Sequence, residues 1–200
     1  MAFGSAFGLL QKRFVPRAAL AAVLAAFMFV QPAPAQAATK AEEIDSLFSG
    51  MCLAYLGDGH QIVAQAKGIG AKPLPDMIAS QFLAPRKGVA WAVQGGAGLY
   101  MLGLNDQLGC RVIGPDASAA ESLRTFAAGP KRRKIGEEVI NGRVQHVFAV
   151  VANDAITEQP KHMVVIISAS PDAKTPGVFL DAMPYGIAQQ AGIVIDHWPE

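Results

Sequence analysis

The chain has 200 residues, of which 52% are hydrophobic and 16% are charged, and its formal net charge is +1. Residues 1–37 contain three of the 17 basic residues and none of the 16 acidic ones, so the rest of the chain has a net charge of −2. The weakly positive total therefore gives no support for a nucleic-acid partner, and residues 38–200 suffice for one domain with a substantial core.

The N-terminal segment has the three parts of a secretory signal peptide. Three basic side chains between residues 12 and 17 precede the apolar run Ala18–Val30, and Ala35-Gln36-Ala37 supplies an A-x-A cleavage site. We expect cleavage between Ala37 and Ala38, which leaves residues 38–200 as a single periplasmic or secreted domain. The alternative is an uncleaved membrane anchor. A membrane span needs about 20 apolar residues and this run is shorter, so we expect no span after cleavage.

Two cysteines, Cys52 and Cys110, lie 58 positions apart. In an exported protein an isolated pair favours a disulfide over a metal site, and the alternative is two buried free thiols. Cys52 falls on the apolar face of a predicted helix and Cys110 begins a predicted strand. We therefore predict a Cys52–Cys110 bridge.

Helical periodicity dominates the first part of the domain. Thr39 and Glu42 have the spacing of a capping box, and the apolar residues behind them recur at helical spacing up to a stop at Gly57. A second helix is predicted over His60–Lys67. A third begins at Pro75-Asp76, ends before Pro85, and is predicted to bury Met77, Ile78 and Phe82. Another capping box, at Ser118 and Glu121, predicts one mid-chain helix.

After Pro85 the apolar period changes from 3.6 to 2, which is typical of strands. The predicted strands, with the last as a possible edge strand, are 89–93, 99–104, 110–113, 135–140, 143–151, 162–170 and 178–183. The fold class that follows is α+β, with the N-terminal helices and one mid-chain helix packed on one face of an antiparallel sheet of about six or seven strands. Residues 185–200 form a tail with no predicted place.

The dipeptide Asn141-Gly142 favours a two-residue hairpin loop, and this fixes a register. Glu137 then lies opposite His146, and both share a face with the apolar residues Ile135, Val139, Val144 and Phe148. A carboxylate beside an imidazole could orient a general base, or it could be an ion pair at the margin of the sheet. No nucleophile can be assigned to this pair from the sequence.

Other motifs point to no reaction. No G-x-S-x-G sequence surrounds any serine, the four histidines are scattered singly, and the glycine clusters have the context of turns. We therefore predict no metal and no cofactor. The only dense charge block is formed by Lys131, Arg132, Arg133 and Lys134. It is either a solvated strand entry or a contact for an anionic envelope surface.

Several stretches together resemble small, exported, uncharacterised proteins of Gram-negative bacteria: 71–75 (AKPLP), 87–93 (KGVAWAV), 110–112 (CRV), 134–139 (KIGEEV) and 162–170 (HMVVIISAS). The resemblance implies compartment and class but no activity. The sequence therefore favours a non-catalytic domain that binds an envelope component or another protein. The alternative is a small periplasmic hydrolase that uses Glu137 and His146.

Overall fold

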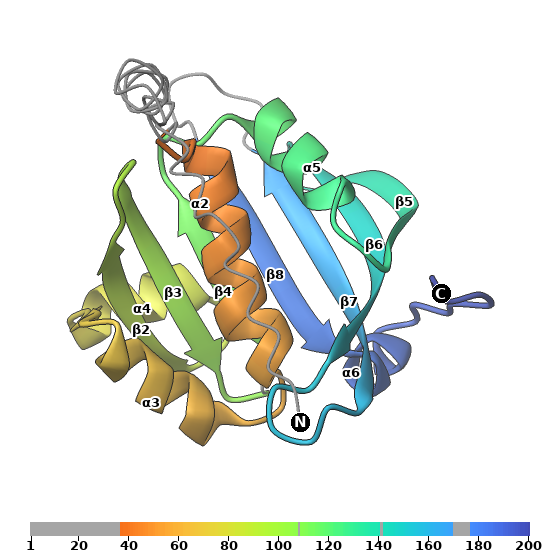
Figure 1. Cartoon of the computed structure of the whole chain (residues 1–200), viewed down its shortest axis with the longest axis horizontal. Coiled ribbons are helices and arrows are strands. Elements are labelled where there is room, and N and C mark those ends of the chain that lie inside the picture. Colours follow the sequence, from red (N-terminus) through yellow and green to blue (C-terminus); the bar gives the residue numbers. More distant parts are fainter. Residues whose placement is uncertain (1–36, 108, 141, 170–176) are drawn as a thin grey trace, which may run out of the picture. The chain divides into compact units, whose positions relative to one another are not determined.

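The computed structural model describes residues 37–107, 109–140, 142–169 and 177–200. These residues belong to a single compact unit of α+β architecture, with an antiparallel sheet in the order β1-β2-β3-β4-β8-β7-β6-β5 (Figure 1). The strands are β1 (Lys72–Pro73), β2 (Gly88–Gln94), β3 (Leu99–Asn105), β4 (Cys110–Gly114), β5 (Arg132–Ile140), β6 (Arg143–Asn153), β7 (Pro160–Ala169) and β8 (Val178–Pro184). The helical elements are α2 (Lys40–Leu47), η1 (Phe48–Leu53), α3 (Gly59–Gly68), α4 (Asp76–Leu83), α5 (Ala119–Ala127) and α6 (Tyr185–Gln190).

The sheet consists of two meanders joined edge to edge. Strands β2–β3–β4 form the first and β5–β6–β7–β8 the second, and β4 pairs antiparallel with β8. The prediction of six or seven strands was too low, because the two-residue strand β1 adds to the outer edge of β2. The prediction of an edge strand at 178–183 was also wrong. β8 lies in the middle of the sheet, and every one of its side chains is buried or half-buried.

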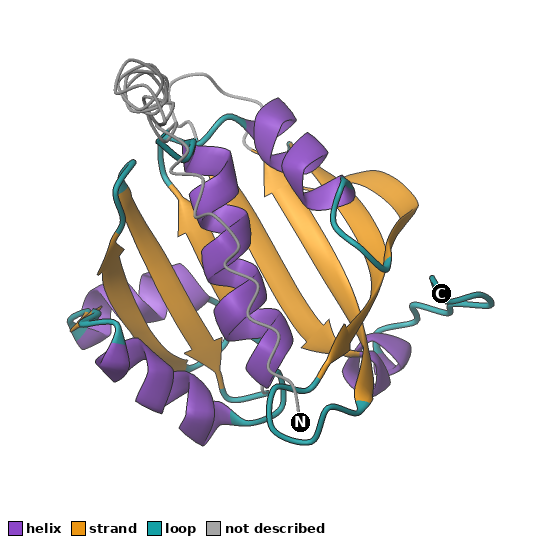
Figure 2. Cartoon of the chain, viewed as in Figure 1, coloured by secondary structure: helices purple, strands orange, loops and turns teal. Residues whose placement is uncertain are grey.

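Helices α2 and η1 form one rod that crosses the front of the sheet in Figures 1 and 2, with α5 beside it. The capping box predicted at its start is present: Thr39 Oγ1 accepts from the Glu42 amide, and the Glu42 carboxylate accepts from the Thr39 amide. The rod widens into a π-helical turn at η1, where the Ala54 amide donates to the Ser49 carbonyl. Gly57, with φ 91°, follows the end of the rod as predicted.

The core between this rod and the sheet is aromatic at its centre. Phe126 of α5 makes edge-to-face contacts with Phe48 of η1 and Phe148 of β6, with ring centroids 5.9 and 5.1 Å apart. All three side chains are buried. They connect both front helices to the second meander.

The predicted disulfide is confirmed. Cys52 of η1 and Cys110 of β4 are bonded, with Cα atoms 5.3 Å apart, within the range that a bridge requires. The bridge ties the helical rod to the first residue of the strand that joins the two meanders. A closed loop of this length contributes on the order of 4 kcal/mol in the chain-entropy model.

The prediction that all helices pack on one face was wrong. Residues alternate across the sheet, and α4 packs against Ala90, Ile113 and Gly103, which face away from α2. The third predicted helix is therefore present but buries Ala79, Phe82 and Leu83, whereas Met77 and Ile78 are exposed. Helix α6, within the unassigned tail, packs at the other end of this second face, where Ala188 contacts Ala149 and Val164.

The close approach of α4 depends on the absence of a side chain at Gly103. A Cβ at this position would lie 2.4 Å from the Phe82 ring and 2.7 Å from Leu83. We predict that Gly103→Ala lowers the free energy of unfolding by about 1–3 kcal/mol, measured by urea denaturation, because two packed side chains must move.

Gly50 is the matched control. It is exposed, and a Cβ there would meet nothing within 4 Å, so Gly50→Ala should be neutral or stabilise by up to about 1 kcal/mol. Equal stabilities of the two variants would show that α4 does not need the glycine.

Candidate functional site

The hairpin register predicted from Asn141-Gly142 is largely confirmed. Glu137 pairs with His146, and Ile140 pairs with Arg143; Gly142 has φ 74°, and Asn141 lies outside the described residues. Two details were wrong. A bulge between Lys134 and Gly136 places Lys134 opposite Phe148 and turns Ile135 toward the second face of the sheet.

The second detail concerns Val139. It was expected on the apolar face that points at the helices, but it is 69% exposed and not covered by them. The tip of the hairpin therefore lies beyond the apolar core of the front face.

Glu137 and His146 lie at the end of one row of paired residues that crosses the front face. The row runs Trp91, Leu102, Val112, Leu180, Ile167, His146 and Glu137. Its first five members are buried, whereas the His146 side chain is 14% exposed and that of Glu137 is 52% exposed. The pair thus marks the margin of the core.

The geometry of the pair does not complete a catalytic site. Glu137 Oε2 lies 3.1 Å from His146 Nδ1, but this nitrogen makes no hydrogen bond within the described residues. The pKa of Glu137 is lowered, first by its bond to Lys134 and then by His146. Ser168 is no nucleophile for His146, because it pairs with Gln145 and projects from the opposite face; Ser170 lies outside the described residues.

The block Lys131–Lys134 is not one surface. Arg132 is 7% exposed and points into the front layer, where it donates to Asp45, Ser49 and the Phe126 carbonyl at 2.7, 2.8 and 2.9 Å. Its guanidinium also lies over the Phe126 ring, 4.2 Å from the centroid. The assignment of Arg132 to an anionic-surface contact was therefore wrong.

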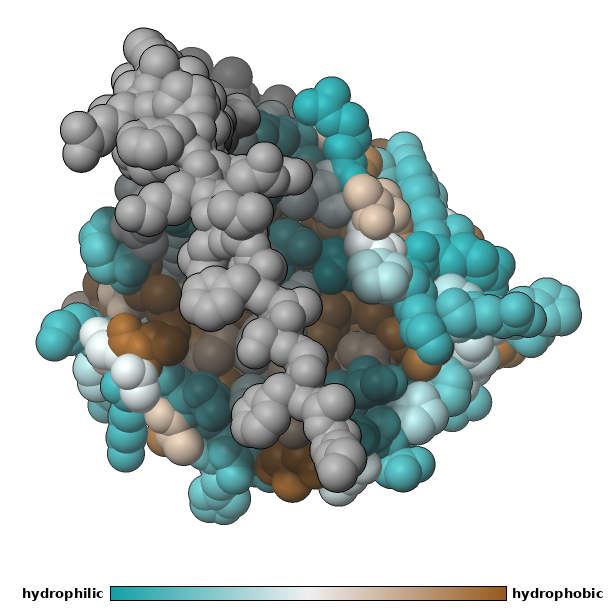
Figure 3. All heavy atoms as spheres, viewed as in Figure 1, coloured by the Kyte–Doolittle hydropathy of each residue, from teal (hydrophilic) through white to brown (hydrophobic). Residues whose placement is uncertain are grey.

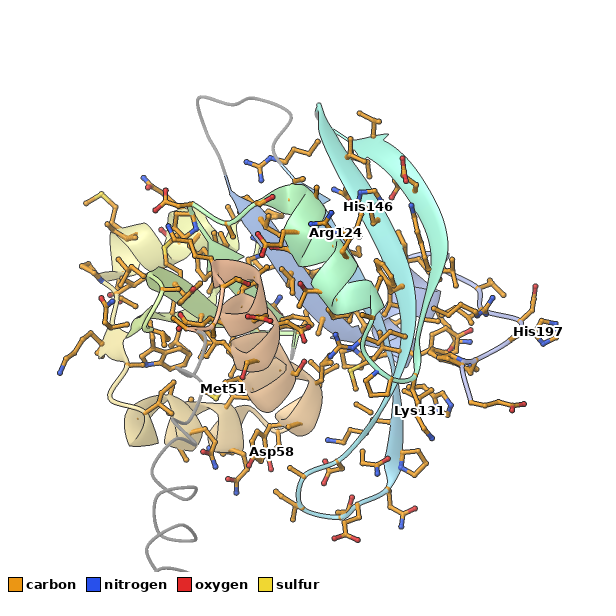
Figure 4. The ribbon with its side chains drawn as sticks, turned by 45° about the horizontal axis from the view of Figure 1, so that its top comes forward. Met51, Asp58, Arg124, Lys131, His146 and His197 are labelled. Carbon is orange, nitrogen blue, oxygen red and sulfur yellow. A yellow bond between two sulfur atoms is a disulfide. The ribbon has the colours of Figure 1, made fainter. Side chains whose placement is uncertain are left out.

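The other three basic residues of the block are exposed. Arg133 donates to the His197 carbonyl of the C-terminal segment, and Lys134 pairs with Glu137. Hydrophilic side chains predominate around α5 and β5 in the space-filling view of Figure 3. In Figure 4, Lys131 lies at the start of β5, away from His146 and His197.

We predict that Arg132→Ala lowers the free energy of unfolding by about 2–4 kcal/mol, because it removes the donor to the Asp45 carboxylate and the packing of the guanidinium on the Phe126 ring. Lys131→Ala, one residue away on the surface, should change stability by less than about 0.5 kcal/mol. Thermal and urea denaturation measure both. If Arg132→Ala is as stable as the parent protein, the buried role of Arg132 is wrong and it again becomes a candidate for the anionic-surface contact.

A concavity lies on the second face, between α4 and α6. It has a volume of about 480 Å³. In Figure 1 this face is turned away, with α4 behind β2 and β3 and α6 at the lower ends of β7 and β8. Its floor is formed by side chains that alternate outward from four strands: Arg111, Phe179, Asp181, Met183, Ile166, Ser168, Gln145 and Arg143. We call it the α4–α6 groove.

An ion pair lies at the centre of this floor. Arg111 of β4 and Asp181 of β8 are registered partners, and Arg111 Nε and Nη2 donate to the two carboxylate oxygens at 2.5 and 3.3 Å. Arg111 Nη1 donates to the Phe82 carbonyl at the C-terminal end of α4. Burial raises the pKa of Asp181, and Arg111 opposes this effect. The Arg111 guanidinium thus joins β4 to β8 and to the end of α4.

Two further arginines line the groove. The Arg143 guanidinium lies over the Phe179 ring, 4.3 Å from its centroid, and Arg86 lies on the exposed segment after α4. Within the part of the chain that the structure describes, neither has an acidic partner. The groove therefore has three guanidinium groups and one carboxylate.

Sequence reasoning missed the charged residues of the groove. Arg86, Arg111, Arg143 and Asp181 are far apart in the chain and form no motif. The available signal was the position of Arg111 and Asp181 on otherwise apolar strands, which indicates a partner within the fold.

Residues 37–107, 109–140, 142–169 and 177–200 contain no cluster of histidine, cysteine, aspartate and glutamate suited to a metal ion. None of the helices described is both long and apolar enough to cross a membrane. No protein-family model, curated protein or solved structure matches the chain. The resemblance to exported proteins of Gram-negative bacteria stays a prediction.

Proposed function

We propose that this protein is an exported domain that binds a small anionic molecule in the α4–α6 groove. The observation that carries the proposal is the Arg143 guanidinium, which lies over the Phe179 ring on a concave floor and has no acidic partner among the described residues. A guanidinium packed on a ring loses little freedom when it forms a bidentate bond to a carboxylate or phosphate. The groove volume of about 480 Å³ is within the range of small-molecule sites.

The charge balance of the groove supports an anion. Asp181 is neutralised by Arg111 at 2.5 Å, which leaves Arg86 and Arg143 to attract a ligand. Ser168 and Gln145 share one row across the strands with Phe179, next to Arg143, and can donate further hydrogen bonds. This arrangement favours binding over catalysis, because it offers donors for an anion without a paired nucleophile and base.

We predict that inorganic phosphate and acetate shift the amide NMR signals of Gln145, Ser168 and Phe179 in the mature protein in a saturable manner. Arg143→Gln should weaken this response at least about tenfold, because it removes a charge-assisted bond. Arg124→Gln is the matched control, since Arg124 is an exposed arginine on α5 of the front face. A response absent from the groove, or equal in both variants, would overturn the proposal.

Export is the second part of the proposal, supported by the charge, apolar run and A-x-A site of residues 1–37 and by the Cys52–Cys110 disulfide. We predict that the full chain, produced in a Gram-negative host, yields a periplasmic or secreted protein whose intact mass corresponds to a start at Ala38. Recovery of the full-length chain in the membrane fraction would contradict this.

A further inference from the structure

The α4–α6 groove is amphipathic along its length. The polar side chains Gln145 and Ser168 lie next to Arg143 at one end. Along β7, the next residue on the same face after Ser168 is Ile166, followed by Val164 under α6. The floor thus changes from polar to apolar along β7, and Asp181 of β8, paired with Arg111, lies beside Ile166 between the two ends.

The apolar end is only partly covered. Ile166, Met183 and Ile187 are half-buried and line the groove. Along β8, Phe179 and Met183 are four residues apart on the same face, which corresponds to about 13 Å. A ligand that covers both ends must therefore be elongated.

We propose that the ligand of the groove is an anionic amphiphile with a single hydrocarbon chain. Its head would bind Arg143, Gln145 and Ser168, and its chain would cover Ile166, Met183 and Ile187. The inference rests on the proposed function and adds the class of ligand. Charge complementarity favours the head at the Arg143 end, because Asp181 is paired with Arg111 and Arg143 has no acidic partner within the described residues.

A chain-length series tests the inference. Hexanoate, octanoate and decanoate, with the matching alkyl phosphates, are titrated into the mature protein by calorimetry below their micelle concentrations. We expect the affinity to rise up to about fourfold for each CH₂ group that becomes buried. The tighter of the two series identifies the head group as a carboxylate or a phosphate. Octanol, which lacks the charge, should bind at least about tenfold more weakly than octanoate, and equal binding would overturn the inference.

A variant separates the inference from the proposed function. Ile187→Gln should abolish the dependence on chain length while the NMR response of Gln145 and Ser168 to inorganic phosphate persists. Ile69→Gln, at an exposed isoleucine after α3 and outside the groove lining, is the control and should bind as the parent does. Affinity independent of chain length with an intact phosphate response overturns the amphiphile alone. If the parent protein shows no response to any anion in the groove, both the amphiphile and the proposed function are overturned.

Discussion

The pairing of β4 with β8 joins two meanders whose strands are otherwise paired only within each meander. Each face of the molecule depends on this pair. On the front, Cys110 holds the disulfide to η1, and Val112 and Leu180 are fully buried beneath the helices. On the back, the neighbouring residues Arg111 and Asp181 form the ion pair, and Arg111 also binds the end of α4. One stretch of backbone pairing thus positions both helical layers.

The two faces of the sheet differ because of how much apolar surface each has to cover. Large apolar side chains run across nearly all the strands on the front, and the rod of α2 and η1 together with α5 covers them. On the back, apolar clusters form at the two ends, where α4 and α6 pack, and Phe179 and Ile166 lie beside the polar residues between them. Arg111, Asp181, Ser168 and Gln145 occupy the strip between, and polar groups of this kind need hydrogen-bond partners rather than an apolar helix. Because none of the described helices covers this polar strip, the groove remains open between α4 and α6.

Local rules account for the parts that were predicted correctly. The capping box at Thr39, the stop at Gly57 and the pairing of Glu137 with His146 each depend on residues close in the chain. No residue pattern indicated the bulge at Ile135, where one extra residue reverses the direction of a side chain. The surface position predicted for Arg132 was wrong for a related reason, because its partner Asp45 lies on α2, far away in the sequence.

The sequence by itself determined the α+β class, the antiparallel pairing of the hairpins, the disulfide and a segment with the features of an export signal. The class, the hairpins and the export segment depend on composition, periodicity and spacing, which are local properties of the chain, whereas the disulfide follows because the chain has only two cysteines. Only the tertiary structure decided that β8 lies at the centre of the sheet and that α4 and α6 pack on its second face. It also brought Arg86, Arg111, Arg143 and Asp181 into one groove. Pairing between strands distant in the chain is set by which edges and apolar faces remain uncovered after local folding, and no short window of residues contains that information.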